Sequence, residues 1–206
     1  MDPNWLRWAK QLAGLAQDGL TYSDNPYDID RYEQMRDMAA EMMATGFDLE
    51  KKSVIELLIR EEGYATAKVD VRGVAFRDEK ILLVREKLDG GWTLPGGWAD
   101  PWQSPSEAVV REVFEESGFE SKVTKLAAVW DRSKHPHVPY MPFHIYKLFF
   151  LCEITGGQAT ESIETTGVDF FALDALPELS ISRTLPEQIA RMYEHWRNPA
   201  LPTDFD

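Results

Sequence analysis

The hydrophobic pattern of this chain changes its period once, near residues 63–68, and that change constrains the fold more than any other feature. In the first part, apolar residues recur at helical spacing and no strand pattern is present. In the second part, short apolar runs are separated by turn residues, which is typical of strands. We therefore expect a helical domain over residues 1–65 and a second domain of α+β class over residues 66–206.

The expected elements follow from these patterns. In the first domain we expect helices at 4–16, 29–44 and 49–62, with a break after Gly19 and a stop at Gly46. In the second domain we expect strands at 68–76, 80–85, 92–94, 123–130, 144–154 and 168–173, and a last helix at 185–196. A further helix is expected at 105–117, and it carries the most informative residues.

Composition excludes several classes of protein. The 206 residues include 22 Lys and Arg and 35 Asp and Glu, and the net charge of −13 argues against binding to nucleic acid backbones. No apolar run approaches the roughly 20 residues of a membrane span, and the first ten residues lack the apolar core of a signal peptide. Cys152 is the only cysteine and lies in an apolar run, so we expect a buried thiol and a cytoplasmic location.

The helix expected at 105–117 has clear start and stop signals. Ser104 is a favourable N-cap, Pro105 suits the first helical position and Glu107 completes a capping box. Gly118 suits the C-terminal cap. The helix has an apolar side of Val109, Val110, Val113 and Phe114, and an acidic side of Glu112, Glu115 and Glu116.

The acidic side predicts a metal site. Glu112 and Glu116 are one turn apart, and like charges at this spacing destabilise a helix by roughly 0.2–0.5 kcal/mol per pair. Mg²⁺ bound by carboxylate oxygens would offset that cost, especially where phosphate is the other ligand. The simpler alternative is a solvated acidic face. The two glycines of the preceding loop, Gly96 and Gly97, favour the metal site because they let the backbone approach a ligand.

These residues resemble the Nudix box, G-x5-E-x7-R-E-U-x-E-E-x-G-U, in which U is apolar. The matching residues are Gly97, Arg111, Glu112, Val113, Glu115, Glu116, Gly118 and Phe119. The resemblance implies the Nudix fold, a mixed sheet between helices, from about Ala67 to the C-terminal helix. It also implies hydrolysis of a pyrophosphate link with Mg²⁺ as cofactor and Mn²⁺ as an alternative.

One position departs from the box. Gln103 stands where the box has Glu. The amide keeps a hydrogen-bond acceptor for Arg111 but loses the charge, so we expect altered activity or metal affinity rather than none. Glu107 is a second candidate partner for Arg111.

The resemblance also implies roles for individual residues. Glu112 and Glu116 are expected to bind the metal, with the carbonyl of Gly97 as a further ligand. Arg111 and Glu115 are expected to act with them in catalysis, since Arg111 can pair with Glu115 one turn away. The general base is expected from this helix or from a later loop. In that loop the candidates are Glu161 and Glu164, which could equally be exposed residues without a role.

Candidates for substrate binding lie in two loops. Gly96 and Trp98 belong to the loop before the helix, and an aromatic ring there could stack on a base or on a choline-like cation. His135 and His137 could contact phosphate or transfer protons near neutral pH, or they could be loop residues without a role. His144 is expected to be structural. Core packing is the alternative for most of the aromatic residues in this part of the chain.

Several stretches resemble a bacterial Nudix subgroup that has an N-terminal helical domain. They are DVRGVAF, LPGGWAD, the Lys134-His135 loop and SISRT at 180–184. The subgroup implies a nucleoside diphosphate derivative as substrate, CDP-choline or ADP-ribose, and a homodimer, with no membrane partner. Two alternatives stay open: a Nudix-fold nucleotide sensor without turnover, favoured only by Gln103, and an enzyme that processes RNA ends.

Overall fold

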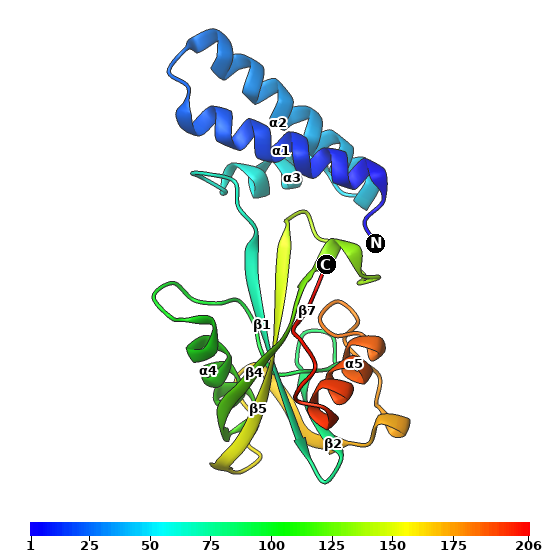
Figure 1. Cartoon of the computed structure of the whole chain (residues 1–206). Coiled ribbons are helices and arrows are strands. Elements are labelled where there is room, and N and C mark those ends of the chain that lie inside the picture. The colour runs from blue at the N-terminus through cyan, green and yellow to red at the C-terminus, as the bar shows by residue number, and fades with distance from the viewer. The chain divides into compact units, whose positions relative to one another are not determined.

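The computed structural model describes all 206 residues. The chain divides into two compact units (Figure 1). The first consists of Met1–Ala67 and Tyr140–His144, and the second of Lys68–Pro139 and Ile145–Asp206. Each unit has a hydrophobic core of its own and is described separately below.

The first unit is built from three helices, as the sequence predicts. They are α1 (Asn4–Tyr22), α2 (Pro26–Phe47) and α3 (Lys51–Ile59). Their shared core consists of Leu6, Ala9, Ala40, Met43, Ala44 and Val54. Small alanines and one flexible methionine at the contact allow the helices to pack closely.

The first two helices are longer than predicted, because two glycines serve packing and do not end a helix. A Cβ atom at Gly46 would lie 2.2 Å from the ring of Trp5, and one at Gly19 would lie 2.3 Å from the ring of Tyr32. The prediction that Gly46 stops the second helix is therefore wrong: α2 continues to Phe47. It begins at Pro26, whose preceding residue accepts a hydrogen bond in the N-cap position.

The second unit is a mixed seven-stranded sheet. Its strands are β1 (Lys68–Arg77), β2 (Lys80–Glu86), β3 (Trp92–Thr93), β4 (Phe119–Asp131), β5 (Ile145–Gly157), β6 (Thr165–Phe171) and β7 (Asp204–Phe205). They lie in the order β3-β2-β1-β5-β4-β7, with β6 paired to β2. β1 and β5 are parallel neighbours, and β4 and β5 are antiparallel. The six strands expected from the sequence are all present, with shifted ends.

The sheet lies between two helices, α4 (Pro105–Ser117) and α5 (Pro186–Arg197), as Figure 1 shows. On one side, Val109 and Val113 of α4 pack with alternate residues of β1 such as Val71. On the other side, Ile189 and Met192 of α5 pack in a second core. Because side chains alternate along a strand, β1 contributes to both cores.

The short strand β7 was not predicted. It pairs in parallel with Ala128 and Val129 of β4. A strand of two residues is too short to show an alternating pattern, so the sequence could not indicate it. Arg191 holds this strand in place through two hydrogen bonds to Asp204. The C-terminal segment is thereby tied to the sheet.

Candidate active site

Helix α4 has the boundaries that the sequence predicts. Ser104 accepts a hydrogen bond from the backbone N–H of Glu107, and the Glu107 carboxylate accepts one from the backbone N–H of Ser104. Gly118 ends the helix in a left-handed conformation with φ of 75°. Glu107 is thus engaged in the capping box, and no contact with Arg111 is present, so Glu107 does not replace the missing box carboxylate.

The glycine loop before α4 lies directly over β1. Gly96 has φ of 141°, and a Cβ atom there would lie 2.0 Å from the carbonyl oxygen of Val71. Only glycine fits this position. The carbonyl of Gly97 accepts a hydrogen bond from the Val71 N–H at 2.8 Å, and the Gly96 N–H donates to Oε2 of Glu116 at 2.8 Å. The loop therefore connects β1 to the acidic side of α4.

Glu112 and Glu116 have very different surroundings from those of an exposed acidic face. Glu116 is 5% exposed, and burial raises the pKa of its carboxyl to about 8. Burial also raises the pKa of Glu112, and the charge of Glu112 adds to the raised pKa of Glu116. The simpler alternative of a fully solvated acidic face is therefore wrong for Glu116.

Arg111 connects the loop to the carboxylates of α4. Its guanidinium donates to Oε2 of Glu115 at 2.6 Å and to Oε1 of Glu112 at 3.0 Å. It also donates to Oε1 of Gln103 at 3.1 Å and pairs with Asp100 at 3.0 Å. Gln103 thus keeps the hydrogen bond expected of this position, while the charge that the box carries there is supplied in part by Asp100.

Strand β1 adds a buried charged cluster that the sequence analysis did not identify. Arg72 makes two hydrogen bonds to Asp70, at 2.9 and 2.7 Å, and Lys147 of β5 donates to Asp70 at 2.6 Å. Burial disfavours the charged forms, but the two cations outweigh it for Asp70 and hold its pKa at about 2. Arg72 also stabilises the ionised forms of Glu116 and Glu86. Charged residues inside an otherwise apolar strand were the available signal.

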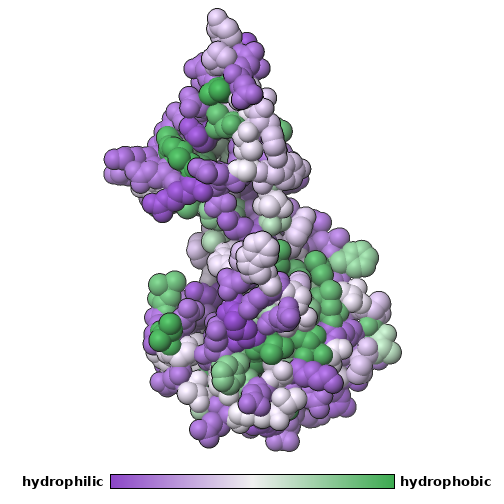
Figure 2. Space-filling model, turned by 90° about the vertical axis from the view of Figure 1, so that its left-hand side faces the viewer, coloured by the Kyte–Doolittle hydropathy of each residue, from purple (hydrophilic) through white to green (hydrophobic).

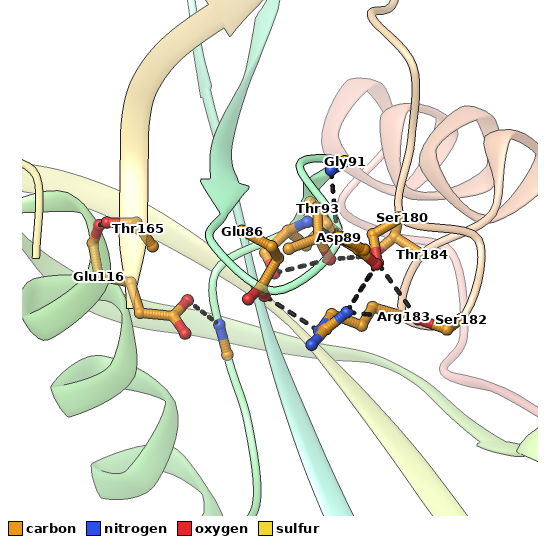
Figure 3. Close-up of polar contacts among 12 residues, drawn as sticks. Glu86, Asp89, Gly91, Thr93, Glu116, Thr165, Ser180, Ser182, Arg183 and Thr184 are labelled. Carbon is orange, nitrogen blue, oxygen red and sulfur yellow. Dashed lines mark hydrogen bonds and ion pairs between the residues drawn. The ribbon is translucent and has the colours of Figure 1, made fainter. Parts of the chain in front are cut away.

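A second polar cluster lies at the end of β2 (Figure 3). Arg183 pairs with Glu86 at 3.1 Å and with Asp89 at 3.0 Å. Ser180 donates a hydrogen bond to Asp89 at 2.7 Å. Burial raises the pKa of Glu86, and negative charge on Glu86 disfavours ionisation of Glu116. The SISRT segment therefore faces the same group of carboxylates as α4.

Glu164, the candidate general base, lies next to this group. Glu164 is exposed, and its charge acts on the carboxyl of Glu86. The following residue, Thr165, donates its hydroxyl hydrogen bond to the carbonyl of Glu116 at 2.9 Å. Glu161 is also exposed. The loop that carries Glu161 and Glu164 is thus attached to α4 at Glu116, close to Glu164.

The two loop histidines have protein partners. His137 is buried, with Nδ1 bound to the carbonyl of Ile181 at 2.9 Å and Nε2 to the amide of Gln188 at 3.2 Å. Burial, together with the nearby Lys147, lowers its pKa to about 3, so the ring is neutral and serves structure. His135 pairs with Asp206 at 3.5 Å and packs on Trp130.

Two aromatic residues, one in the glycine loop and one on α4, are exposed. Trp98 forms a backbone bridge with Asp70 and its side chain is 47% exposed, which leaves its ring accessible. Phe114 was expected on the apolar side of α4, but it is 53% exposed. Ala108, Glu116 and Ser117 are buried instead, so the face of α4 that contacts the sheet is rotated toward the glutamates.

The donors at α4 fit a hard divalent cation. Glu112 and Glu116 present carboxylate oxygens one turn apart, and the raised pKa of both groups shows that negative charge there lacks full compensation. No three Asp, Glu, His or Cys side chains form a closed cage. An open site of two carboxylates suits Mg²⁺, which usually keeps water and takes phosphate oxygens as its other ligands.

A sheet between two helices, with a capped glutamate helix behind a glycine loop, defines the Nudix class of hydrolases. Residues 67–194 match the family model of the NUDIX domain. Residues 3–58 match a model described as the UDP-X-like, N-terminal oligomerisation domain. The chain belongs to the Nudix family and is a Nudix hydrolase, a family whose members generally use divalent metal ions.

The similar proteins match either nearly the whole chain or about two thirds of it. A Bacillus subtilis protein named "Putative ADP-ribose pyrophosphatase YjhB" is 44% identical over 98% of this chain and 97% of its own. The crystal structure of a UDP-X diphosphatase is 33% identical, with a TM-score of 0.63 and 98% of both chains covered. That of an ADP-ribose pyrophosphatase from Streptococcus suis is 36% identical, with a TM-score of 0.61, covering 68% of this chain and 100% of its own.

The helices give one further result. None of them combines the length and the apolar character that crossing a bilayer requires.

Proposed function

We propose that this protein hydrolyses the pyrophosphate link of a nucleoside diphosphate joined to a second group, with Mg²⁺ as the resident cation. The observation that supports this most directly is the buried, incompletely compensated carboxylate of Glu116 beside Glu112, behind a glycine loop. ADP-ribose comes first among substrates because a relative that matches 98% of this chain is named for it, as is a solved structure that matches 68% of this chain. CDP-choline, expected from the subgroup resemblance, comes second.

In this proposal Glu112 and Glu116 hold the cation, and Gly97 offers its carbonyl as a further donor. A bound divalent cation neutralises the pyrophosphate and lowers the pKa of water. Arg111 keeps Glu112 and Glu115 in place through its hydrogen bonds. Gly96 fixes Glu116 by donating its N–H, which also partly compensates the carboxylate.

Glu164 is our candidate for the general base, with Glu115 as the second candidate. Glu164 is exposed and so can approach a substrate-bound water, whereas Glu115 already accepts a hydrogen bond from Arg111. Glu164→Gln should lower kcat far more than Glu115→Gln. The reverse order would assign the base to α4. Trp98 and His135 remain proposed substrate contacts.

We also propose that residues 1–65 form a domain that pairs two copies of the chain and that residues 66–206 form the hydrolase domain. The division of the chain near Ala67 supports this boundary. The exposed apolar residues of α1 support the pairing and are considered in the Discussion. A cytoplasmic location is part of the proposal, because Cys152 is a free, buried thiol.

The function is tested by a phosphate-release screen with Mg²⁺, a coupled phosphatase and an EDTA control. The panel contains ADP-ribose, CDP-choline, UDP-sugars, diadenosine polyphosphates, nucleoside triphosphates and a 5′-labelled RNA. Metal-dependent cleavage of a diphosphate derivative, lost in Glu116→Gln, is the expected result.

Silence across the panel with nucleotide binding retained would favour the sensor. In that case Gln103→Glu is the first variant to assay, because it restores the box carboxylate beside Arg111. Cleavage of RNA alone would favour the RNA-end enzyme.

A further inference from the structure

Arg183 is a partly exposed cation whose guanidinium is held at two of its three nitrogens. Its Nε pairs with Glu86 at 3.1 Å, and its Nη1 donates to Asp89 at 3.0 Å and to Ser180 at 2.9 Å. Its side chain is 23% exposed. Two carboxylates and a hydroxyl therefore hold the planar group in one orientation. The side chain is ordered before any ligand binds, so binding would cost little further side-chain entropy.

The third nitrogen, Nη2, carries unused donors. It makes no hydrogen bond within the chain, and it is absent from the buried atoms that lack a partner, so it reaches solvent. A charged N–H donor held in a fixed orientation suits an oxygen of a phosphate or carboxylate group.

The position of Arg183 links it to the proposed metal site. Figure 3 shows Glu86 between Glu116 and Arg183. Both Arg183 and Arg72 favour the ionised form of Glu86, while Glu86 disfavours ionisation of Glu116. These carboxylates repel an anionic substrate unless cations compensate. Arg72 uses all three of its nitrogens on Asp70 and the Leu94 carbonyl, whereas Arg183 retains a free Nη2.

We propose that Arg183 binds a phosphate group of the nucleoside diphosphate through Nη2, and that Asp89, Ser180 and Glu86 pre-orient it for this contact. This inference rests on the proposed function and adds a substrate-binding residue from outside the Nudix box. Arg183 acts in substrate binding and leaves proton transfer to other groups. Its loss should therefore weaken binding more than it slows the chemical step.

The test measures binding of ADP and of adenosine to the full chain by calorimetry in EDTA, for wild type and Arg183→Gln. We expect the Kd of ADP to rise about tenfold in the variant, equivalent to about 1.4 kcal/mol, and the Kd of adenosine to stay within twofold. An unchanged Kd for ADP, or no measurable binding of ADP to wild type, would overturn the proposal. Equal losses for ADP and adenosine would also overturn it, because they would indicate general damage to the site.

A control variant separates the phosphate contact from a loss of positive charge alone. Arg197→Gln removes the same charge from an exposed ion pair with Glu79 and should leave both Kd values unchanged. An equal rise in the Kd of ADP for Arg197→Gln and for Arg183→Gln would contradict a direct contact at Arg183.

Steady-state kinetics with Mg²⁺ on the substrate found in the screen give a second measurement. Arg183→Gln should raise KM about tenfold and leave kcat within about threefold. A fall in kcat with unchanged KM would contradict the proposal. Because the calorimetry needs no turnover, Arg183-dependent binding of ADP would support the inference even if every substrate in the screen remained intact.

Discussion

At the scale of single residues, the site is a balance of buried charges. Glu116 lies in surroundings that disfavour its ionised form, and its Gly96 and Arg72 partners reduce that cost without removing it. Asp70 is in the opposite position, because Arg72 and Lys147 hold its pKa at about 2 despite burial. Two carboxyl groups that both interact with Arg72 thereby have opposite pKa shifts, which suits them to different tasks.

This balance makes a pH-dependent prediction for the metal-free protein. The pKa of Glu116 rises from 4.5 to about 8 on folding, so the folded state binds a proton that the unfolded state releases between these values. The stabilising contribution is present at low pH and is lost as pH rises toward 8, by at most about 1.4 kcal/mol per pH unit. Because Glu116→Gln lacks this titration, its free energy of unfolding should increase with pH relative to that of wild type.

Urea unfolding of both proteins in EDTA at two pH values, about 5.5 and 7.5, measures the difference. The comparison isolates Glu116, because His137, whose lowered pKa has the opposite effect on stability below neutral pH, is present in both. Parallel pH profiles would show that Glu116 is ionised throughout. Mg²⁺ should stabilise wild type more than Glu116→Gln.

At the scale of elements, small residues decide how the N-terminal helices pack. Gly46 lies in α2 where the ring of Trp5 leaves no room for a Cβ atom, whereas a Cβ at Gly14 of α1 would have its nearest neighbour at 3.6 Å. Glycine is costly inside a helix by roughly 0.5–1 kcal/mol relative to alanine. The same substitution should therefore have opposite effects at the two positions.

We predict that Gly14→Ala leaves stability unchanged or raises it by up to about 1 kcal/mol. Gly46→Ala should lower stability by about 1–3 kcal/mol, because Trp5 must leave its position. Thermal unfolding followed by circular dichroism distinguishes the two. A Gly46→Ala protein as stable as Gly14→Ala would show that Trp5 moves without cost.

At the scale of the whole molecule, α1 has a second apolar face. Trp8, Leu15 and Tyr22 are seven residues apart and are 60%, 60% and 70% exposed. Leu6, Ala9 and Ala16 of the same helix are fully buried in the core of the unit. Figure 2 shows apolar surface among the polar surface of this unit. A heptad row of exposed apolar residues is typical of a helix that pairs with another helix.

We predict that this row forms the contact between two copies of the chain. Wild type should elute as a dimer in size-exclusion chromatography with light scattering, and Trp8→Glu combined with Leu15→Glu should be monomeric and remain helical. A control that replaces exposed Leu88, on the β2–β3 turn, by Glu should stay dimeric. A dimeric double variant would place the contact elsewhere.

The sequence by itself determined the local part of this protein. Capping signals defined α4 from Pro105 to Ser117, and the spacing of Arg111, Glu112 and Glu116 indicated the catalytic chemistry, because both depend on neighbours within one or two turns. The helical part and the strand-rich part could be told apart in the sequence because helical and strand periodicity also depend only on nearby residues. Gly46 was misjudged because its role depends on Trp5, which is remote in sequence.

Only the tertiary structure decided which charges meet. Lys147 reaches Asp70 because β1 and β5 are parallel neighbours, and Arg183 reaches Glu86 because the segment before α5 lies against the end of β2. Such pairs are far apart in the chain and leave no periodic signal. Burial is likewise a property of the assembled core, and it changes the carboxyl of Glu116 from a solvated group into one whose pKa is about 8.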